Sequence, residues 1–272
     1  MSSSHQILGT TVDTPVKVRN ARCFMAGFSA SAEKVAAAIA PTGLEPVTLP
    51  RGLDIPRSLN PLKLLESRTL CLFIIVDYID NDLGPYNEFA VCIPVKSPPG
   101  IAAPVHDAGT DESATTRDDK SEGKGIDMSS VLVHSLPVDG EFTLAAGRGI
   151  WGFPKILADF DVDHEARKPH GRVSADGKLI ADLTISRGIK APGEAKPLTF
   201  HAFSHIDGVT RMIPWDFDSM AEVTTRVGGA SLKLGDHPIG EELRSFDLSK
   251  HALMTTVVGK VEMTFNDATV VS

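Results

Sequence analysis

Short apolar runs, separated by glycine, proline, asparagine and aspartate, limit the fold of this chain more than any other feature of its sequence. Runs of this length are typical of β-strands, and long amphipathic helices do not alternate with them as repeating β-α-β units would require. The sequence therefore predicts a sheet-rich domain. We expect single strands at Arg22–Phe28, Leu70–Tyr78, Glu88–Val95, Ser130–Leu136, Glu141–Ala146, Leu157–Val162, Leu198–Phe203, Gly208–Ile213, Glu222–Gly228 and Met254–Phe265.

One helix and one tight hairpin are also expected. The helix is predicted over Ser31–Ala40, where a serine can cap the first turn and a proline follows the last residue. The hairpin is predicted over Arg172–Ile185, which contains an Asp-Gly pair at its centre. Many strands with few helices favour an α+β, mostly β fold around a curved or closed antiparallel sheet, which removes exposed edges and can enclose a pocket.

The domain organisation follows from length and composition. A chain of 272 residues is within the range of one β-rich domain, so we expect a single domain over residues 1–272 with residues 1–20 as an N-terminal extension. The segment His106–Gly125 is rich in charged and small polar residues, and it has too little apolar surface to offset its ordering entropy. We expect residues 106–125 to be a flexible loop insertion, either a plain surface loop or a lid over a substrate site.

Net charge and cysteine content indicate which classes of binding partner and which cellular compartment to expect. Acidic residues outnumber basic ones by 35 to 27, which gives a net charge of −8, the wrong sign for a protein that binds a phosphate backbone. No apolar run approaches the ~20 residues of a membrane span, and the N-terminus lacks a secretory signal. Three cysteines without a Cys-x-x-Cys spacing indicate neither a disulfide framework nor a metal site. We expect a cytoplasmic protein that binds no nucleic acid, membrane or metal.

The segment Ala145–Leu157 contains three glycines in the order G-x-G-x-x-G, as in dinucleotide-binding loops. That fingerprint needs a helix that starts within the motif, and Pro154 with its apolar neighbours does not favour one. We therefore predict no nucleotide cofactor. The same segment places Lys155 among apolar residues, where burial would favour a neutral amine able to attack a carbonyl and form a Schiff base. The local sequence leaves open an edge-strand lysine that points to solvent.

Four stretches in the same order resemble the acetoacetate decarboxylase family. Gly147–Lys155 is similar to the family's Gly-Arg-Glu-x-x-x-x-Pro-Lys-Lys signature, in which the first lysine forms a Schiff base. Arg22–Pro41 is similar to an arginine-led strand and helix, Leu83–Glu88 to the segment with a catalytic glutamate, and Gly228–His237 to a late strand and turn. The resemblance covers most of the chain from Arg22 to about Phe265.

The resemblance implies roles for individual residues. Lys155 would be the Schiff-base nucleophile, Glu88 a carboxylate for proton transfer, and Arg22 a cation that holds an anionic substrate. We predict the substrate-binding residues Phe73, Trp151 and Phe153. His134, which aligns with a family histidine, is expected to be a packed structural residue.

The chain also departs from the family signature. Ile156 replaces the second lysine, so burial alone must lower the pKa of the nucleophile, and Gly149 replaces the signature's glutamate. An apolar residue near Phe73 stands where the family has another glutamate. These replacements favour an apolar pocket, and such a pocket suits a larger or less charged carbonyl compound better than it suits acetoacetate.

Together these features predict a cofactor-independent Schiff-base lyase that acts on a keto acid or a related carbonyl compound. Aldol condensation, dehydration or cyclisation through the same lysine is the alternative chemistry. A pocket protein that binds a small ligand without converting it is the alternative of another class. The resemblance further implies a homo-oligomer.

Overall fold

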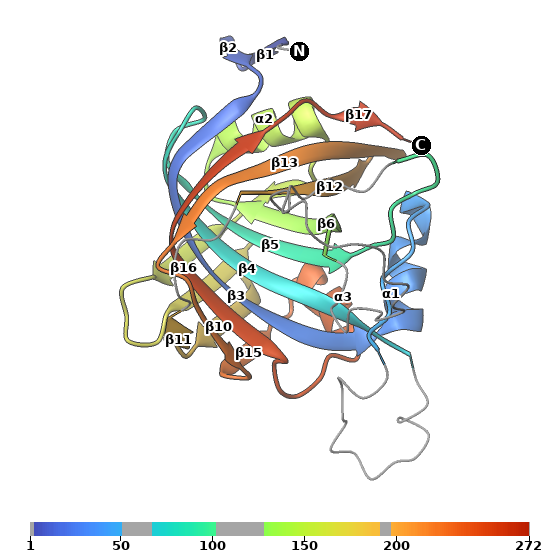
Figure 1. Cartoon of the computed structure of the whole chain (residues 1–272), viewed down its shortest axis with the longest axis vertical. Coiled ribbons are helices and arrows are strands. Elements are labelled where there is room, and N and C mark those ends of the chain that lie inside the picture. Colours follow the sequence, from blue (N-terminus) through green and yellow to red (C-terminus); the bar gives the residue numbers. More distant parts are fainter. Residues whose placement is uncertain (1–2, 51–66, 102–127, 191–196, 272) are drawn as a thin grey trace, which may run out of the picture.

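A hydrogen-bonded sheet closes on itself to form a barrel of seven strands (Figure 1). The computed structural model describes residues 3–50, 67–101, 128–190 and 197–271. Pairing of β13 with β16 closes the ring, and β6 with β12 is the one parallel pair between neighbouring described barrel strands. The predicted closed sheet is confirmed, with this parallel pair in addition. Around the barrel the strands are β16 (Met254–Phe265), β3 (Val16–Ser31), β4 (Arg68–Asn81), β5 (Tyr86–Pro94), β6 (Ser130–Val138), β12 (Leu198–Ile206) and β13 (Val209–Ala221).

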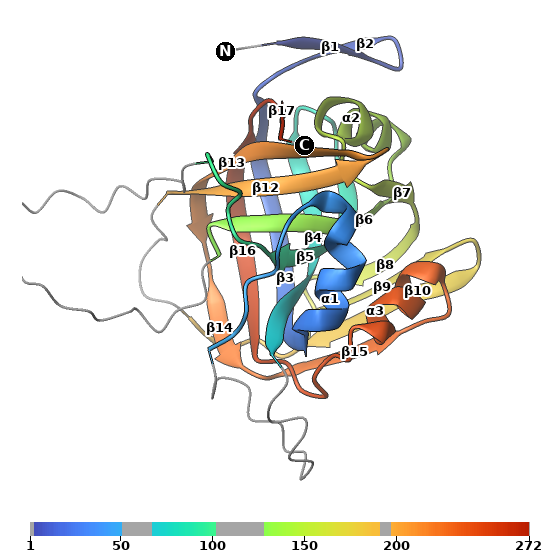
Figure 2. The ribbon, with the colours of Figure 1, turned by 90° about the vertical axis from the view of Figure 1, so that its right-hand side faces the viewer.

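A second sheet of four strands packs outside the barrel, and Figure 2 shows it at the lower right, beside the barrel strands and next to helix α3 (Pro238–Ser245). Its order is β15 (Ala230–Leu234), β10 (Lys178–Ile185), β9 (His170–Ala175) and β8 (Asp159–Asp163). β9 and β10 form the predicted hairpin, because Asp176 and Gly177 both adopt the positive φ that a tight turn requires. Short strands complete the fold: β1 (Ser4–Ile7), β2 (Thr10–Asp13), β7 (Lys155–Leu157), β11 (Ile189–Lys190), β14 (Thr224–Val227) and β17 (Thr269–Val270).

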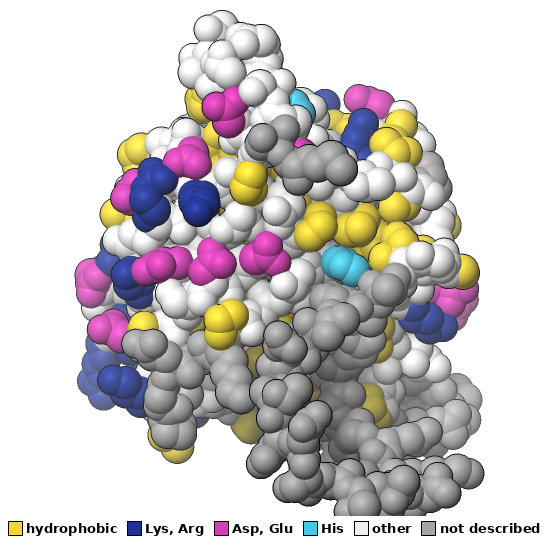
Figure 3. Space-filling model, turned by 45° about the horizontal axis from the view of Figure 1, so that its top comes forward, with side chains coloured by type: hydrophobic (Ala, Val, Ile, Leu, Met, Phe, Trp, Pro, Cys, Tyr) yellow, Lys and Arg dark blue, Asp and Glu magenta, His cyan; other side chains and the backbone are white. Residues whose placement is uncertain are grey.

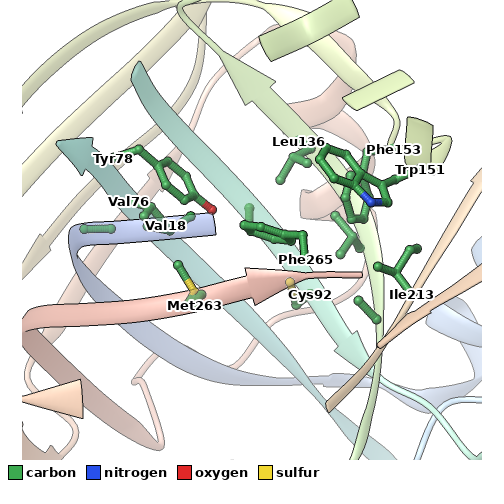
Figure 4. Packing of buried hydrophobic residues seen from close by; sticks show 14 of the residues in the cluster. Val18, Val76, Tyr78, Cys92, Leu136, Trp151, Phe153, Ile213, Met263 and Phe265 are labelled. Carbon is green, nitrogen blue, oxygen red and sulfur yellow. The ribbon is translucent and has the colours of Figure 1, made fainter. Parts of the chain in front are cut away.

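Successive side chains of each barrel strand point to opposite faces of the sheet, and the apolar ones form two hydrophobic cores. On β3, Ala21 and Cys23 belong to the core inside the barrel, whereas Phe24 and Phe28 belong to the core between the barrel's outer face and the second sheet. Figure 4 shows the inner core, to which strands from all around the barrel contribute. The inner core is the part of the fold that surrounds the candidate site.

Within the described ranges three α-helices accompany the sheets, where the sequence predicts one. α1 (Ala32–Ile39) confirms the predicted helix, with the Ser31 side chain as its cap, and a 3-10 turn, η1 (Ala40–Thr42), follows it. α3 (Pro238–Ser245) was not predicted. α2 (Glu141–Trp151) occupies the segment where a strand was expected over Glu141–Ala146, so that prediction is wrong.

The error at α2 has a physical cause. The buried residues of this segment recur at the helical spacing of three and four, but the two glycines inside it argue against a helix from propensity alone. Tertiary packing of the buried face outweighs that propensity.

The remaining predictions concern the ends and loops of the chain. Residues 16–20, assigned above to an extension, are the first residues of barrel strand β3, and β1 and β2 form a hairpin beyond the barrel (Figure 1). The predicted loop at residues 106–125 lies outside the described residues. The three cysteines are free and buried. No helix in the described ranges is both long and apolar enough to cross a membrane.

The described surface in Figure 3 carries charges of both signs. Acidic and basic side chains are interspersed on this face, next to a group of apolar side chains. No broad basic surface is visible among the described side chains of that face, which fits the acidic balance of the sequence.

Candidate functional site

A buried ion pair lies inside the barrel. Lys155 is the first residue of β7, and Glu88 points inward from β5. The lysine Nζ is 3.1 Å from the Oε2 atom of Glu88, and both side chains are almost completely buried, with exposures of 3% and 4%. The structure thus brings together two residues that the sequence proposed for catalysis.

Three further polar side chains surround this pair. The Lys155 Nζ donates a hydrogen bond of 2.8 Å to Thr143 Oγ1, and the Tyr78 hydroxyl donates one of 3.1 Å to Glu88 Oε1. The ring of Tyr86 lies under the ammonium, with 4.8 Å between Nζ and the ring centroid. Tyr78 and Tyr86 stack on each other, with centroids 4.4 Å apart.

Sequence reasoning missed these three residues, although a signal existed for one of them. Tyr86 and Glu88 are two positions apart on a strand, so their side chains must share a face. Tyr78 and Thr143 come from a different strand and from α2, and no sequence pattern relates them to Lys155.

The glycine-rich segment before Lys155 holds the lysine in place. A Cβ atom on Gly147 would lie 2.5 Å from Lys155 Cδ, so the lysine stem packs directly on this glycine's backbone. Arg148 donates a hydrogen bond of 3.2 Å to the Lys155 carbonyl, and Gly152 ends α2 with a left-handed φ of 66°. The glycines therefore position Lys155. Helix α2 ends within the glycine motif, whereas a nucleotide-binding loop requires a helix that begins there.

Burial sets the protonation of these groups. It lowers the pKa of the Lys155 ammonium below its ordinary value, and the Glu88 carboxylate opposes this shift. Burial also raises the pKa of the Tyr78 and Tyr86 hydroxyls well above their ordinary value of 10. Both phenols therefore remain protonated at neutral pH, whereas the lysine is closer to its neutral, nucleophilic form than an exposed lysine is.

A cavity of about 20 Å³ adjoins the ion pair, which is room for about one water molecule. Trp151 and Phe153, two of the predicted substrate-binding residues, belong to its lining. A substrate larger than water therefore requires lining side chains to move. The lining consists of Val16, Val18, Tyr78, Asn81, Leu83, Tyr86, Glu88, Val133, Leu136, Trp151, Phe153, Lys155, Trp215 and Phe265.

The structure places Arg22 and Phe73 away from this cavity, contrary to expectation. Arg22 pairs with Asp77 at 2.9 Å and with Glu165, outside the barrel. Its neighbour Ala21 takes the inward position, because successive strand residues face opposite sides. Phe73 is fully buried in the outer core, so it packs the second sheet against the barrel. Neither residue is retained as a candidate site residue.

Two histidines, His134 and His205, form polar contacts with residues other than Lys155 and Glu88. His134 lies 3.2 Å from Glu242 and packs near Phe246, as expected of a structural residue. His205 forms a hydrogen bond of 2.8 Å with Thr210. In the described ranges, no cluster of three metal-ligating side chains is found.

A family model matches almost the whole chain. The family model described as acetoacetate decarboxylase (ADC) matches residues 8–271. A search of curated proteins found no match.

Several solved structures share the fold. An acetoacetate decarboxylase from Legionella pneumophila is 17% identical, with 95% of this chain and 87% of that chain covered and a TM-score of 0.58. An acetoacetate decarboxylase-like enzyme from Sphingomonas wittichii RW1 is 12% identical, with 97% and 96% covered and a TM-score of 0.56. The enduracididine biosynthesis enzyme MppR, complexed with pyruvate, is 12% identical, with 95% and 90% covered and a TM-score of 0.57. At these identities the likeness shows the fold alone.

Proposed function

Because this chain belongs to the acetoacetate decarboxylase family, we propose that it is a cofactor-independent enzyme whose Lys155 forms a Schiff base with a carbonyl substrate. The observation that carries the proposal is the buried contact of 3.1 Å between Lys155 and Glu88 beside an apolar cavity. Burial disfavours the ammonium form, so a neutral amine is accessible at a pH where exposed lysines are protonated.

The two residues divide the proton transfers. Glu88 accepts a proton from the Lys155 ammonium, and the neutral amine adds to the substrate carbonyl carbon. Glu88 gives that proton back as the adduct loses water, which leaves an iminium beside the Glu88 carboxylate. The iminium withdraws the electron pair of a neighbouring bond. If that bond is to a carboxyl group, CO2 leaves and an enamine remains; its carbon then takes a proton that comes from solvent through Glu88.

Tyr78 and Thr143 support these steps. The Tyr78 hydroxyl binds one oxygen of Glu88, so the other oxygen stays directed at Lys155. Thr143 accepts a hydrogen bond from the lysine and restrains the position of Nζ. Both are positioning residues, because they act through Glu88 and Lys155.

The placement of Arg22 favours the alternative chemistry, aldol condensation or dehydration of a carbonyl compound through the same iminium. Among the described residues that line the cavity, Lys155 and Glu88 alone have charged side chains, and they neutralise each other. Pyruvate, a keto acid, is bound in the MppR complex. In this chain a substrate carboxylate would add a second negative charge to a mostly apolar lining, whereas a neutral ketone or aldehyde would not.

Borohydride trapping tests the proposal. The protein is incubated with pyruvate, or with butan-2-one as a neutral ketone of similar size, then reduced and measured by intact mass. We expect a covalent adduct in the wild type and in Lys178→Ala, a variant of an exposed hairpin lysine, but none in Lys155→Ala. An adduct of equal yield in Lys155→Ala would refute the assignment.

A second variant distinguishes loss of the nucleophile from loss of the folded structure. Lys155→Ala leaves Glu88 buried without its partner, which destabilises proteins by about 3–5 kcal/mol. The double variant Lys155→Met/Glu88→Gln has similar side-chain volumes and no buried charge, so it should fold and still form no adduct.

A further inference from the structure

The ring of Tyr86 occupies a position that the proposed mechanism has not yet used. Its centroid is 4.8 Å from the Lys155 Nζ, within the ~6 Å at which an aromatic face attracts a cation. Tyr86 is buried, with 8% of its surface exposed, and lies two residues before Glu88 on β5. The nitrogen that reacts is therefore enclosed by the Glu88 carboxylate, the Thr143 hydroxyl and this ring.

The ring is held in that position by its neighbours. Tyr78 stacks on it with an interplanar angle of 21°, and the ring is buried among the residues that line the cavity. The ring face is thus oriented toward the nitrogen before any substrate arrives.

The hydrogen-bonding capacity of the nitrogen falls during the reaction. A lysine ammonium has three N–H donors, enough for both Glu88 and Thr143. When the amine condenses with a carbonyl compound, water leaves and the iminium nitrogen keeps a single hydrogen. It can then donate to only one of these two partners, although it carries a full positive charge. An aromatic face needs no donor hydrogen, so it stabilises that charge after the second hydrogen bond is gone.

We propose that Tyr86 is a catalytic residue whose ring face stabilises the cationic iminium at Lys155, an inference that rests on the proposed function. The ring interacts weakly with the neutral amine and strongly with the cation, so it favours iminium formation rather than binding both states equally. Tyr78 does not share this role, because its described contact with the pair is the hydroxyl bond to Glu88.

Fluorinated phenylalanines at position 86 test the inference. Each fluorine withdraws electron density from the ring face while the ring shape is nearly kept. The equilibrium constant for iminium formation is measured by borohydride trapping with pyruvate and with butan-2-one, at several pH values, so that it refers to the neutral amine. We expect the constant to fall steadily from Tyr86→Phe to the trifluorophenylalanine variant, by about 2- to 30-fold in total.

Phe89 offers a matched control on the same strand. It is fully buried, but it belongs to the outer core on the opposite face of β5. The same fluorinated series at Phe89 should leave the constant unchanged. A flat series at position 86, with normal adduct formation at Lys155, would overturn the role of Tyr86 and leave the proposed function intact. Absence of any adduct at Lys155 in the wild type would overturn both.

Discussion

Replacement of Gly147 by alanine should slow Schiff-base formation by roughly 10²-fold in a protein that still folds. A Cβ atom at this position would lie 2.5 Å from Lys155 Cδ and 2.6 Å from Cε, whereas ordinary contacts begin at 3.4 Å. The lysine stem must therefore move by about 1 Å, which disturbs the Nζ contacts with Glu88 and Thr143. A misplacement of about 1 Å at a reacting group can reduce a rate by roughly 10²-fold.

The stability effect of Gly147→Ala is expected to be small because two terms oppose each other. Alanine inside a helix is favoured over glycine by about 0.5–1 kcal/mol. Overpacking against the lysine stem costs about 1–3 kcal/mol. The protein should therefore still fold, with a net loss of stability of up to about 2.5 kcal/mol, measured by thermal unfolding.

Gly149→Ala is the matched control within the same helix. Its Cβ would meet Ile7 Cδ1 at 3.3 Å, and no atom of Lys155 is among its nearest neighbours. The rate of borohydride trapping should stay within about twofold of the wild type, since helix propensity is the main change. If Gly147→Ala trapped butan-2-one as fast as Gly149→Ala, the glycine would not position the lysine and the reasoning would fail.

Three further predictions concern charge. The rate of trapping at Lys155 should rise with pH and level off below the ordinary lysine pKa of 10.5, because burial lowers the pKa and only the neutral amine attacks. A pH profile of the trapping rate with its midpoint at 10.5 would contradict this. Glu88→Gln removes the negative charge that faces the iminium, and only a substrate with a carboxylate can replace that charge. The ratio of pyruvate adducts to butan-2-one adducts should therefore rise by about tenfold or more. An unchanged ratio would show that the charge of Glu88 does not determine which substrate binds. Arg22→Ala should leave that ratio unchanged and cost about 1 kcal/mol of stability in thermal unfolding, because its guanidinium pairs with Asp77 outside the barrel; a selective loss of pyruvate adducts would place Arg22 in the site.

Sequence patterns identify most of the sheet but not the side to which each residue points. The predicted strand Met254–Phe265 matches β16 at both ends, because alternation and turn residues bound it clearly. The resemblance placed Arg22 in the site, but after the register change between Asn20 and Ala21 the inward positions of β3 are Ala21 and Cys23, and Arg22 faces outward. A shift of one residue moves every later side chain to the other face, and local sequence does not reveal it.

Only some of the site residues could be predicted from the sequence, because the others reach the site through tertiary packing. Resemblance to a family pointed to Lys155 and Glu88, and their contact depends on β7 lying beside β6 in the closed barrel. Thr143 joins them only because Glu141–Trp151 is a helix, which the glycines in its sequence concealed. Residues that come together through such packing leave no pattern along the chain.

Exchange of the carbonyl oxygen tests most directly whether Lys155 forms an iminium. Each formation and hydrolysis of an iminium replaces the substrate's carbonyl oxygen with one from water. Butan-2-one incubated with the protein in H2¹⁸O should gain the label faster than in buffer alone, as measured by mass spectrometry. We expect rapid exchange in the wild type and only the background rate in folded Lys155→Met/Glu88→Gln. Equal exchange by the two proteins, or none above background by the wild type with either butan-2-one or pyruvate, would contradict it.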